Sequence, residues 1–283
     1  MAGAGRTAWG QGVTARRRFG QHFLSASWSS RVLEAAAFAP TDHVIEIGPG
    51  RGALTVPLAC TVAALTAVEI DRDLVPALRG RLPGHARVIE GDFLEVPAAA
   101  LFEGGENVRW RVIGNLPYNV SSPILFRLLE LGRTGGRLRD ATLMLQREVA
   151  DRVASPPGSR QYGALSIMVQ LDADVEPLLT LPPGAFRPPP QVWSSVIRLH
   201  FRPPKVAVAD RRRFESLVRS LFSQRRKMLG NALSAAAASR GQLASDALRQ
   251  AGIDRSRRPE TLHLEELARL ADVLDAGDAA GVV

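Results

Sequence analysis

Apolar residues between about residue 25 and residue 201 recur in two alternating patterns, short continuous runs and segments with helical spacing. The short runs predict strands, and apolar residues at every third or fourth position predict helices. Strands are expected over 43–47, 65–70, 87–90, 110–113, 141–146, 175–181 and 194–201. Helices are expected over 25–39, 53–64 and 165–171, and around Leu74–Leu78 and Val149–Val153. This alternation predicts an α/β fold, a Rossmann-like parallel sheet with helices on both faces.

The segment from Phe186 to Val192 contains three consecutive prolines and fits neither period. We interpret it as a rigid connector that can hold Phe186 in a fixed orientation. The alternative is a stiff linker whose phenylalanine only caps the core. When this segment is considered alone, the linker is the better interpretation.

The pattern changes at about Lys205, after which the spacing is helical throughout. This predicts a small all-helical C-terminal domain. Its beginning holds nine basic residues against Asp210 and Glu215: Arg202, Lys205, Arg211, Arg212, Arg213, Arg219, Arg225, Arg226 and Lys227. Such an excess favours a surface that binds phosphates. We therefore expect a basic, flexible arm at 1–18, an α/β domain at 19–203 and a helical RNA-binding domain at 204–283.

Composition narrows the class of protein. The 283 residues carry a formal net charge of +8, which favours a polyanionic partner such as nucleic acid. Cys60 is the single cysteine, so an intrachain disulfide and a cysteine-based metal cluster are excluded, and the five histidines show no metal-ligand spacing. We expect no metal, no membrane contact and a cytoplasmic location. An arginine-rich start without an early acid also resembles an organellar transit peptide, although a basic arm is our interpretation.

A glycine-rich turn follows the first strand of the α/β domain, in the sequence Gly48-Pro49-Gly50-Arg51-Gly52-Ala53. Glycines allow a backbone to approach a ligand closely, and Glu69, about twenty residues on, is placed to accept the hydroxyls of a ribose. Asp92 follows the third strand and could accept a hydrogen bond from an adenine amine. The turn alone is compatible with NAD, with S-adenosylmethionine, or with no ligand.

A second turn follows the fourth strand, with the sequence Ile113-Gly114-Asn115-Leu116-Pro117-Tyr118-Asn119. Ligands of open α/β sheets bind at the carboxyl ends of the strands, where this turn lies. The Asn115 side chain and the Leu116 carbonyl are two acceptors for an exocyclic amine, Pro117 cannot continue a ladder, and Tyr118 offers a flat face. A base-binding site and a turn with a buried tyrosine explain this segment equally well. Together with Glu69 and Asp92, this turn favours an S-adenosylmethionine-dependent methyltransferase that acts on an amine.

Nearly the whole chain resembles the KsgA/RsmA family of ribosomal RNA adenine N6-dimethyltransferases. The matching motifs run in order: Phe19-Gly20-Gln21-His22-Phe23-Leu24, Glu46-Ile47-Gly48-Pro49-Gly50, Val68-Glu69-Ile70-Asp71, Gly91-Asp92-Phe93, Gly114 to Asn119, Leu145-Gln146-Arg147-Glu148-Val149, Tyr162-Gly163, Phe186-x-Pro188-Pro189-Pro190-x-Val192 and Gln224-Arg225-Arg226-Lys227. His22 departs from the asparagine that the family often has at this position.

The resemblance implies S-adenosylmethionine as cofactor and dimethylation of two adjacent adenines in the 3′-terminal hairpin loop of small-subunit (16S) ribosomal RNA. It also implies the cofactor-binding residues His22 and Leu24 beside the methionine, Gly48 beneath the cofactor, Glu69 at the ribose, Asp92 at the adenine, and Asn115. The expected catalytic residues are Asn115, Leu116, Pro117, Tyr118 and Phe186, with Tyr118 and Phe186 covering the flipped target base. Arg225, Arg226 and Lys227 are the expected RNA contacts.

The implied partners are small-subunit ribosomal RNA and the immature small ribosomal subunit, late in its assembly, with a monomer as the default. A large-subunit ribosomal RNA methyltransferase of the antibiotic-resistance type is one alternative, against which Leu116 and the motif from Gln224 to Lys227 argue. A mainly non-catalytic assembly factor is another, although Glu69, Asp92 and Asn115 are all present. A DNA adenine methyltransferase fits less well, because its comparable turn usually has two prolines where this chain has Leu116 and Pro117.

Overall fold

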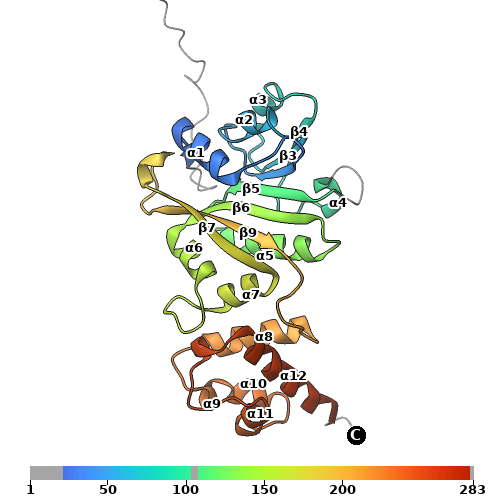
Figure 1. Cartoon of the computed structure of the whole chain (residues 1–283), viewed down its shortest axis with the longest axis vertical. Coiled ribbons are helices and arrows are strands. Elements are labelled where there is room, and N and C mark those ends of the chain that lie inside the picture. The colour runs from blue at the N-terminus through green and yellow to red at the C-terminus, as the bar shows by residue number, and fades with distance from the viewer. Residues whose placement is uncertain (1–21, 103–107, 281–283) are drawn as a thin grey trace, which may run out of the picture.

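The computed structural model describes residues 22–102 and 108–280 (Figure 1). The basic arm expected at 1–18 lies outside the described residues, as do Phe19, Gly20 and Gln21 of the first motif. Among the described residues, no helix has both the length and the apolar character needed to cross a membrane.

A seven-stranded sheet forms the centre of the α/β part, in the order β4-β3-β2-β5-β6-β9-β7. Its strands are β2 (His43–Ile47), β3 (Ala64–Glu69), β4 (Ala86–Glu90), β5 (Trp110–Asn115), β6 (Leu138–Gln146), β7 (Ala173–Leu181) and β9 (Ser194–Phe201). The first five are parallel, whereas β9 runs antiparallel to both β6 and β7. The expected α/β fold is confirmed, but a purely parallel sheet is wrong at one edge. Parallel neighbours need a crossover connection, usually a helix, and no α-helix separates β7 from β9.

Helices cover both faces of this sheet because the side chains of each buried strand point alternately to the two faces. Ile45 of β2 and Val112 of β5 pack in one apolar cluster with Leu125 of α5 (Ser121–Arg133). Their neighbours Val44 and Ile113 join the opposite cluster. That second cluster includes α1 (Ala26–Ala36) and α2 (Thr55–Ala59), while α3 (Val75–Arg79) packs beside it. The remaining helices of the α/β part are α4 (Ala98–Leu101), α6 (Arg147–Ala154) and α7 (Ala164–Asp172).

Helices α2, α4 and α5 differ from the expectation, and the short α4 was not expected. The helix expected over 53–64 is limited to α2, since β3 already begins at Ala64. Helix α5 was not expected at all, although Ile124 and Leu128 have helical spacing. Pro123 lies in its first turn, where a helix tolerates the missing N–H, so this proline does not interrupt the helix.

Phe186 and Arg187 form a short strand, β8, contrary to the expectation that the proline-rich segment has no regular structure. They pair antiparallel with β1 (Phe23–Leu24), which places Leu24 opposite Phe186. This two-stranded sheet joins the start of the described chain to the segment that precedes β9.

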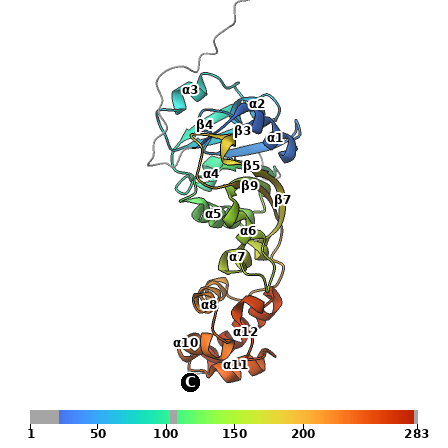
Figure 2. The same ribbon diagram turned by 90° about the vertical axis from the view of Figure 1, so that its left-hand side faces the viewer.

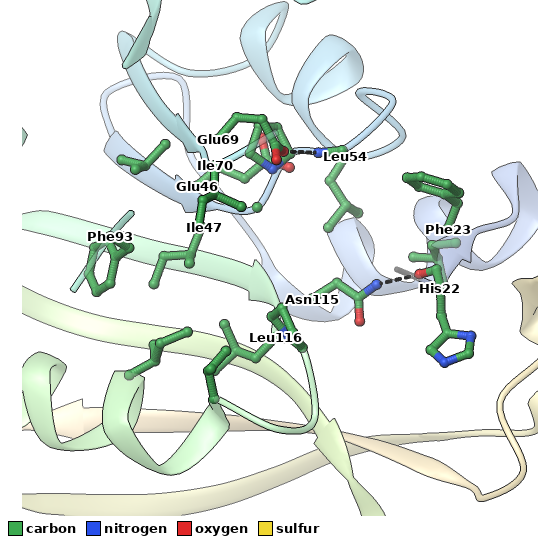
Figure 3. Close-up of a pocket in the computed structure, with 18 of the residues that line it drawn as sticks. His22, Phe23, Glu46, Ile47, Leu54, Glu69, Ile70, Phe93, Asn115 and Leu116 are labelled. Atoms are coloured by element: carbon green, nitrogen blue, oxygen red, sulfur yellow. Dashed lines mark hydrogen bonds between the residues drawn. The ribbon is translucent and has the colours of Figure 1, made fainter. Parts of the chain in front are cut away.

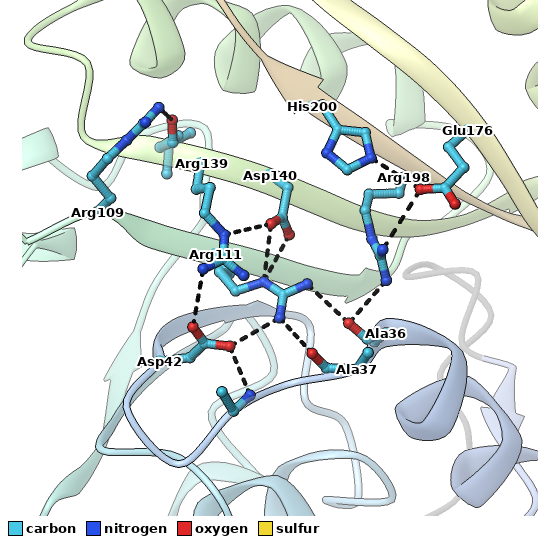
Figure 4. A network of polar contacts seen from close by, with 12 residues as sticks. Ala36, Ala37, Asp42, Arg109, Arg111, Arg139, Asp140, Glu176, Arg198 and His200 are labelled. Carbon is cyan, nitrogen blue, oxygen red and sulfur yellow. Dashed lines mark hydrogen bonds and ion pairs between the residues drawn. The ribbon is translucent and has the colours of Figure 1, made fainter.

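A network around Arg111 fastens the end of α1 to the start of the parallel strands (Figure 4). The buried guanidinium donates to Asp42 at 2.9 Å, to Asp140 at 2.9 Å, and to the carbonyl oxygens of Ala36 and Ala37 at 2.8 and 2.9 Å. The last carbonyls of a helix have no hydrogen-bond donors within the helix, and here the Arg111 guanidinium donates to them. Because α1 directly follows β1, this network also limits the position of the segment from His22 to Leu24.

Beyond Lys205 the structure is helical, as expected: α8 (Arg211–Ser223), α9 (Leu229–Ala232), α10 (Ser234–Ala238), α11 (Ala244–Gln250) and α12 (Leu264–Ala280). Figures 1 and 2 show this part stacked beneath the α/β part, so that the molecule is elongated. The two parts share a core, because Tyr162 and Leu171 pack with Phe214 and Leu217 of α8. The Tyr162 hydroxyl donates to the carbonyl oxygen of Leu262 at 3.1 Å.

Candidate active site

A cavity of about 180 Å³ lies at the carboxyl ends of the parallel strands (Figure 3). Parallel strands end at a common edge of the sheet, so residues from the ends of β2, β3 and β5, and from the segment after β4, meet there. The segment that contains β1 adds a wall from outside the sheet. The residues that line the cavity include all six predicted cofactor-binding residues: His22, Leu24, Gly48, Glu69, Asp92 and Asn115.

The glycine-rich turn forms one side of the cavity. Gly48 has a φ of +68°, and a Cβ built on it meets no atom within 4 Å, so its backbone borders open space. The N–H of Gly50 donates to Glu69 Oε2 at 2.8 Å. This bond ties the turn to the end of β3 and leaves the space above Gly48 free for a ligand.

Glu69 is buried and already accepts backbone hydrogen bonds on both oxygens. Its Oε1 accepts from the N–H of Asp71 at 2.8 Å, opposite the bond from Gly50. Burial raises the pKa of Glu69, and the two backbone donors lower it in part. Each carboxylate oxygen has a further lone pair, so Glu69 can still accept a ligand hydroxyl.

Glu46 is a residue of this site to which the sequence interpretation gave no role. It lies on β2, lines the cavity and is 2 % exposed, and its Oε2 has no hydrogen-bond partner. Burial, together with repulsion from Glu69, raises the pKa of Glu46 to about 8. An acid between apolar residues of a buried strand was the available signal, because charged side chains are almost never fully buried unless they are paired.

Asp92 lies beyond β4, and its Oδ1 accepts from the N–H of Leu94 at 2.9 Å, which fixes the carboxylate at the cavity wall. Its role at an adenine amine stays a prediction.

Asn115 is the last residue of β5 rather than part of the following turn. Its Nδ2 donates to the carbonyl oxygen of His22 at 2.8 Å, as Figure 3 shows. The carboxamide is thereby oriented with its donor toward the β1 segment, and Oδ1 remains as an acceptor at the cavity. The preceding Gly114 lets β5 approach β2, because a Cβ there would lie 3.1 Å from the Ile47 carbonyl oxygen.

The turn after Asn115 brings Tyr118 to the rim of the cavity. The tyrosine hydroxyl lies 2.8 Å from the Oγ of Ser194, the first residue of β9. The ring of His22 stacks on Tyr118 with centroids 5.7 Å apart, and His22 Nδ1 donates to the Pro188 carbonyl oxygen at 2.8 Å. Leu116 is buried in the core, and both Leu116 and Pro117 line the cavity.

The ring of His22 therefore lies beside Tyr118. The main-chain carbonyl of His22 is the group that contacts Asn115. The segment from His22 to Leu24 is brought to the cavity by the β1–β8 pairing.

Phe186 differs from its expected role as a second face for the target base. Its side chain is 1 % exposed and packs with Leu24, Met144 and Ala185. The ring is part of the core beneath the rim, because β8 pairs with β1 and turns this side chain inward. In this conformation it presents no surface to a base.

The three residues expected to contact RNA lie between α8 and α9 but differ in their surroundings. Arg226 and Lys227 are exposed. Arg225 donates to the Arg160 carbonyl oxygen at 2.6 Å and to Glu260 at 3.0 Å, so its guanidinium holds two segments of the protein together. The side chain of Arg225 is still 39 % exposed, and its contact with RNA stays a prediction.

The cavity residues fit a nucleoside cofactor such as S-adenosylmethionine. The open space above Gly48 accepts a ligand against the main chain, Glu69 and Asp92 suit hydroxyl and amine donors, and Glu46 provides an unpartnered oxygen. Among the described residues, no three His, Cys, Asp or Glu side chains are grouped as metal ligands.

The strand order and this cavity define the fold of a class I methyltransferase. The family described as ribosomal RNA adenine dimethylase matches residues 12–275, and the chain belongs to it. "Ribosomal RNA small subunit methyltransferase A" of Acidobacterium capsulatum is 46 % identical over 263 residues, which cover 91 % of this chain and 90 % of that protein. The protein of the same name from Geobacter metallireducens is 43 % identical over 274 residues, with 94 % and 98 % coverage.

Two solved structures are similar over most of this chain. The crystal structure of a dimethyladenosine transferase from Plasmodium falciparum superposes with a TM-score of 0.73 at 25 % identity, covering 88 % of this chain and 96 % of that one. The crystal structure of 23S rRNA methyltransferase ErmE superposes with a TM-score of 0.65 at 28 % identity, covering 89 % and 99 %.

Proposed function

We propose that this protein uses S-adenosylmethionine to dimethylate N6 of two adjacent adenines in the 3′-terminal hairpin loop of small-subunit ribosomal RNA. Family membership and the names of the relatives support this substrate. The observation that carries the chemistry is the orientation of Asn115, whose Nδ2 is taken by the His22 carbonyl and whose Oδ1 is left as an acceptor at the cavity. Such an acceptor suits an exocyclic amine.

S-adenosylmethionine supplies an electrophilic methyl group when it is bound. Gly48 lets it lie against the main chain, Glu69 accepts hydrogen bonds from its ribose hydroxyls and Asp92 accepts from its adenine amine. The walls of the cavity at His22 and Leu24 limit the position of the methionine end. These contacts fix the cofactor relative to Asn115, and orientation of this kind is a major source of rate enhancement.

The target amine is a weak nucleophile because its lone pair is delocalised into the adenine ring. Asn115 Oδ1 and the Leu116 carbonyl accept its two N–H bonds and so favour a pyramidal nitrogen. S-adenosylmethionine held in this cavity would supply the methyl group to this nitrogen, its S–CH3 bond would break with the sulfur as leaving group, and the amine would lose one proton to solvent. Tyr118 covers one face of the flipped base, held by the bond between its hydroxyl and Ser194.

In the second transfer the nitrogen has one N–H fewer, so only one of the two acceptors receives a hydrogen bond and the first methyl group must fit beside the other. We propose the immature small subunit as the assembled substrate, a monomeric enzyme in the cytoplasm, and a division into a cofactor-binding domain at 19–203 and a helical RNA-binding domain at 204–283. The exposed Arg226 and Lys227 support the role of the second domain.

The test is methylation of purified ribosomal subunits from cells that lack the endogenous enzyme, with labelled S-adenosylmethionine. Two N6,N6-dimethyladenines in the 3′-terminal loop of the small-subunit RNA are expected. Label on large-subunit RNA alone would contradict the proposed RNA substrate but would still support a methyltransferase that uses S-adenosylmethionine. Tight binding to small subunits without any label would make the protein an assembly factor.

A further inference from the structure

Trp193 lies outside the cavity lining and directly precedes Ser194, which contacts Tyr118 at the rim. Its side chain is 49 % exposed, and it is the one aromatic residue among the large apolar side chains that are exposed in the described part of the chain. Val192 beside it is 43 % exposed. Single exposed apolar side chains are common, whereas two in succession next to a candidate active site are a candidate contact surface.

The position of Trp193 ties it to the active site. It directly precedes Ser194, whose Oγ lies 2.8 Å from the Tyr118 hydroxyl, and consecutive Cα atoms are about 3.8 Å apart. The Trp193 carbonyl oxygen accepts from the N–H of Arg147 at 2.9 Å, which fixes its main chain to the start of α6. The main chain of Trp193 is therefore fixed next to the serine that contacts Tyr118, and its indole is exposed there.

Two arginines near Trp193 along the chain suit a nucleic acid. Arg147, whose N–H contacts the Trp193 carbonyl, is exposed and lies 3.8 Å from Asp151, and Arg187 is exposed at the other end of the same segment. An aromatic face next to arginine side chains is the combination that binds unpaired nucleotides, by stacking on the base and by attraction to its phosphate.

We propose that Trp193 stacks on an unpaired nucleotide adjacent to the target adenine and so holds the RNA loop in register with the active site. The inference rests on the proposed function, because it takes the neighbouring nucleotide from the same RNA. It assigns Trp193 to substrate positioning, outside the chemical step. Two adjacent adenines are methylated in the proposed reaction. A neighbouring nucleotide stacked on Trp193 would limit how far the RNA strand moves when the second adenine replaces the first in the active site.

The experiment compares Trp193→Ala with Trp193→Phe, which keeps an aromatic face. Binding to a synthetic 3′-terminal hairpin is measured by anisotropy, and KM and kcat are measured on small subunits. Trp193→Ala is expected to weaken hairpin binding and raise KM about tenfold, equivalent to about 1.4 kcal/mol, with kcat nearly unchanged. Trp193→Phe is expected to stay within about threefold of wild type. In wild type, the hairpin is expected to quench a fluorescence component that Trp193→Phe lacks.

The control is Leu243→Ala, which removes an apolar side chain that is 68 % exposed in the helical part. It is expected to leave KM unchanged. Equal hairpin affinity of wild type and Trp193→Ala, with normal methylation, would overturn the stacking and leave the proposed function intact. A Trp193→Ala variant that loses affinity for subunits but not for the hairpin would also overturn it, in favour of a protein contact. A wild-type protein that methylates no small subunit would contradict the proposed function itself.

Discussion

Glu46 shows how strongly a single residue of the cavity depends on its surroundings. Its carboxyl group is buried on β2 near Glu69, and one of its oxygens has no partner in the protein. Burial disfavours the charged form, which is why the pKa rises to about 8. The folded protein therefore holds a proton on Glu46 in a pH range in which the unfolded chain has lost it.

Glu46→Gln tests this protonation through the pH dependence of stability. Between the unperturbed pKa of 4.5 and about 8, the folded state binds more protons, so the free energy of unfolding of the wild type falls as pH rises. Glutamine does not titrate, and the variant is expected to lose most of this slope. A smaller slope remains from Glu69, whose pKa is also raised. Urea denaturation between pH 5 and pH 8.5 measures both proteins, and parallel curves would show that Glu46 does not titrate in this range.

At the scale of elements, the N-terminal segment is held at both ends. The β1–β8 pairing fixes it beside the cavity, and Arg111 fixes the end of α1 to the sheet. Arg111 also helps to keep the buried Asp42 charged. Burial raises the pKa of Asp42, but the Ala39 N–H and Arg111 outweigh that effect, and the pKa is lowered overall.

Arg111→Met is expected to lower the free energy of unfolding by about 3–5 kcal/mol, because the buried Asp42 and Asp140 lose their buried cationic partner and the Ala37 carbonyl loses its donor. The matched control is Arg139→Met, which removes a second arginine from the same two aspartates. Its side chain is 48 % exposed, against 3 % for Arg111, and its loss is expected to cost less than about 1 kcal/mol. Denaturant unfolding measures both, and equal costs would contradict the assignment of the network to Arg111.

The elements that local pattern predicts well are those with a strong period of their own. The strands 43–47 and 194–201 agree with β2 and β9, because their apolar runs are buried by the sheet. The β1–β8 pair could not be predicted from local pattern, since it joins two residues to two others far away in the chain. Helix α5 was missed although its spacing is helical, and Pro123 in its first turn does not interrupt it.

In the candidate site too, local motifs predicted some features, and contacts between distant segments determined the others. Glycines and acids at strand ends predicted the cavity residues, because the parallel topology brings strand ends together. The burial of Phe186 and the pairing of Arg225 depend on contacts with segments distant in sequence, so the local motifs did not reveal them.

At the scale of the whole molecule, a net charge of +8 is combined with an elongated shape in which the helical part extends from the α/β part (Figure 2). The arginines of the basic segment from Arg202 to Lys227 differ in their contacts. Arg225 is paired with Glu260, whereas Arg226 and Lys227 are exposed. Within the motif from Gln224 to Lys227, the electrostatic part of RNA binding is therefore expected to depend on Arg226 and Lys227.

Lys227→Ala is expected to reduce the slope of log affinity against log salt concentration by about 1, because one phosphate contact is lost. Arg249→Ala is the control, since its guanidinium is paired with Asp246 at 3.0 Å, and the slope is expected to stay unchanged. Arg225→Ala is expected to lower thermal stability, through the loss of its bonds to Arg160 and Glu260. Filter binding to small subunits at several salt concentrations gives the slopes, and an unchanged slope for Lys227→Ala would remove this lysine from the RNA surface.

The most direct test of the central claim is mass spectrometry of small-subunit RNA after incubation with S-adenosylmethionine and either wild type or Asn115→Ala. The wild type is expected to yield two adjacent N6,N6-dimethyladenines. The variant is expected to yield none while it binds small subunits with wild-type affinity, because Asn115 orients the amine and lies apart from the basic segment. Cofactor affinity of the variant, measured by calorimetry, separates loss of chemistry from loss of the cofactor site. Dimethylation by Asn115→Ala at the wild-type rate would contradict the account.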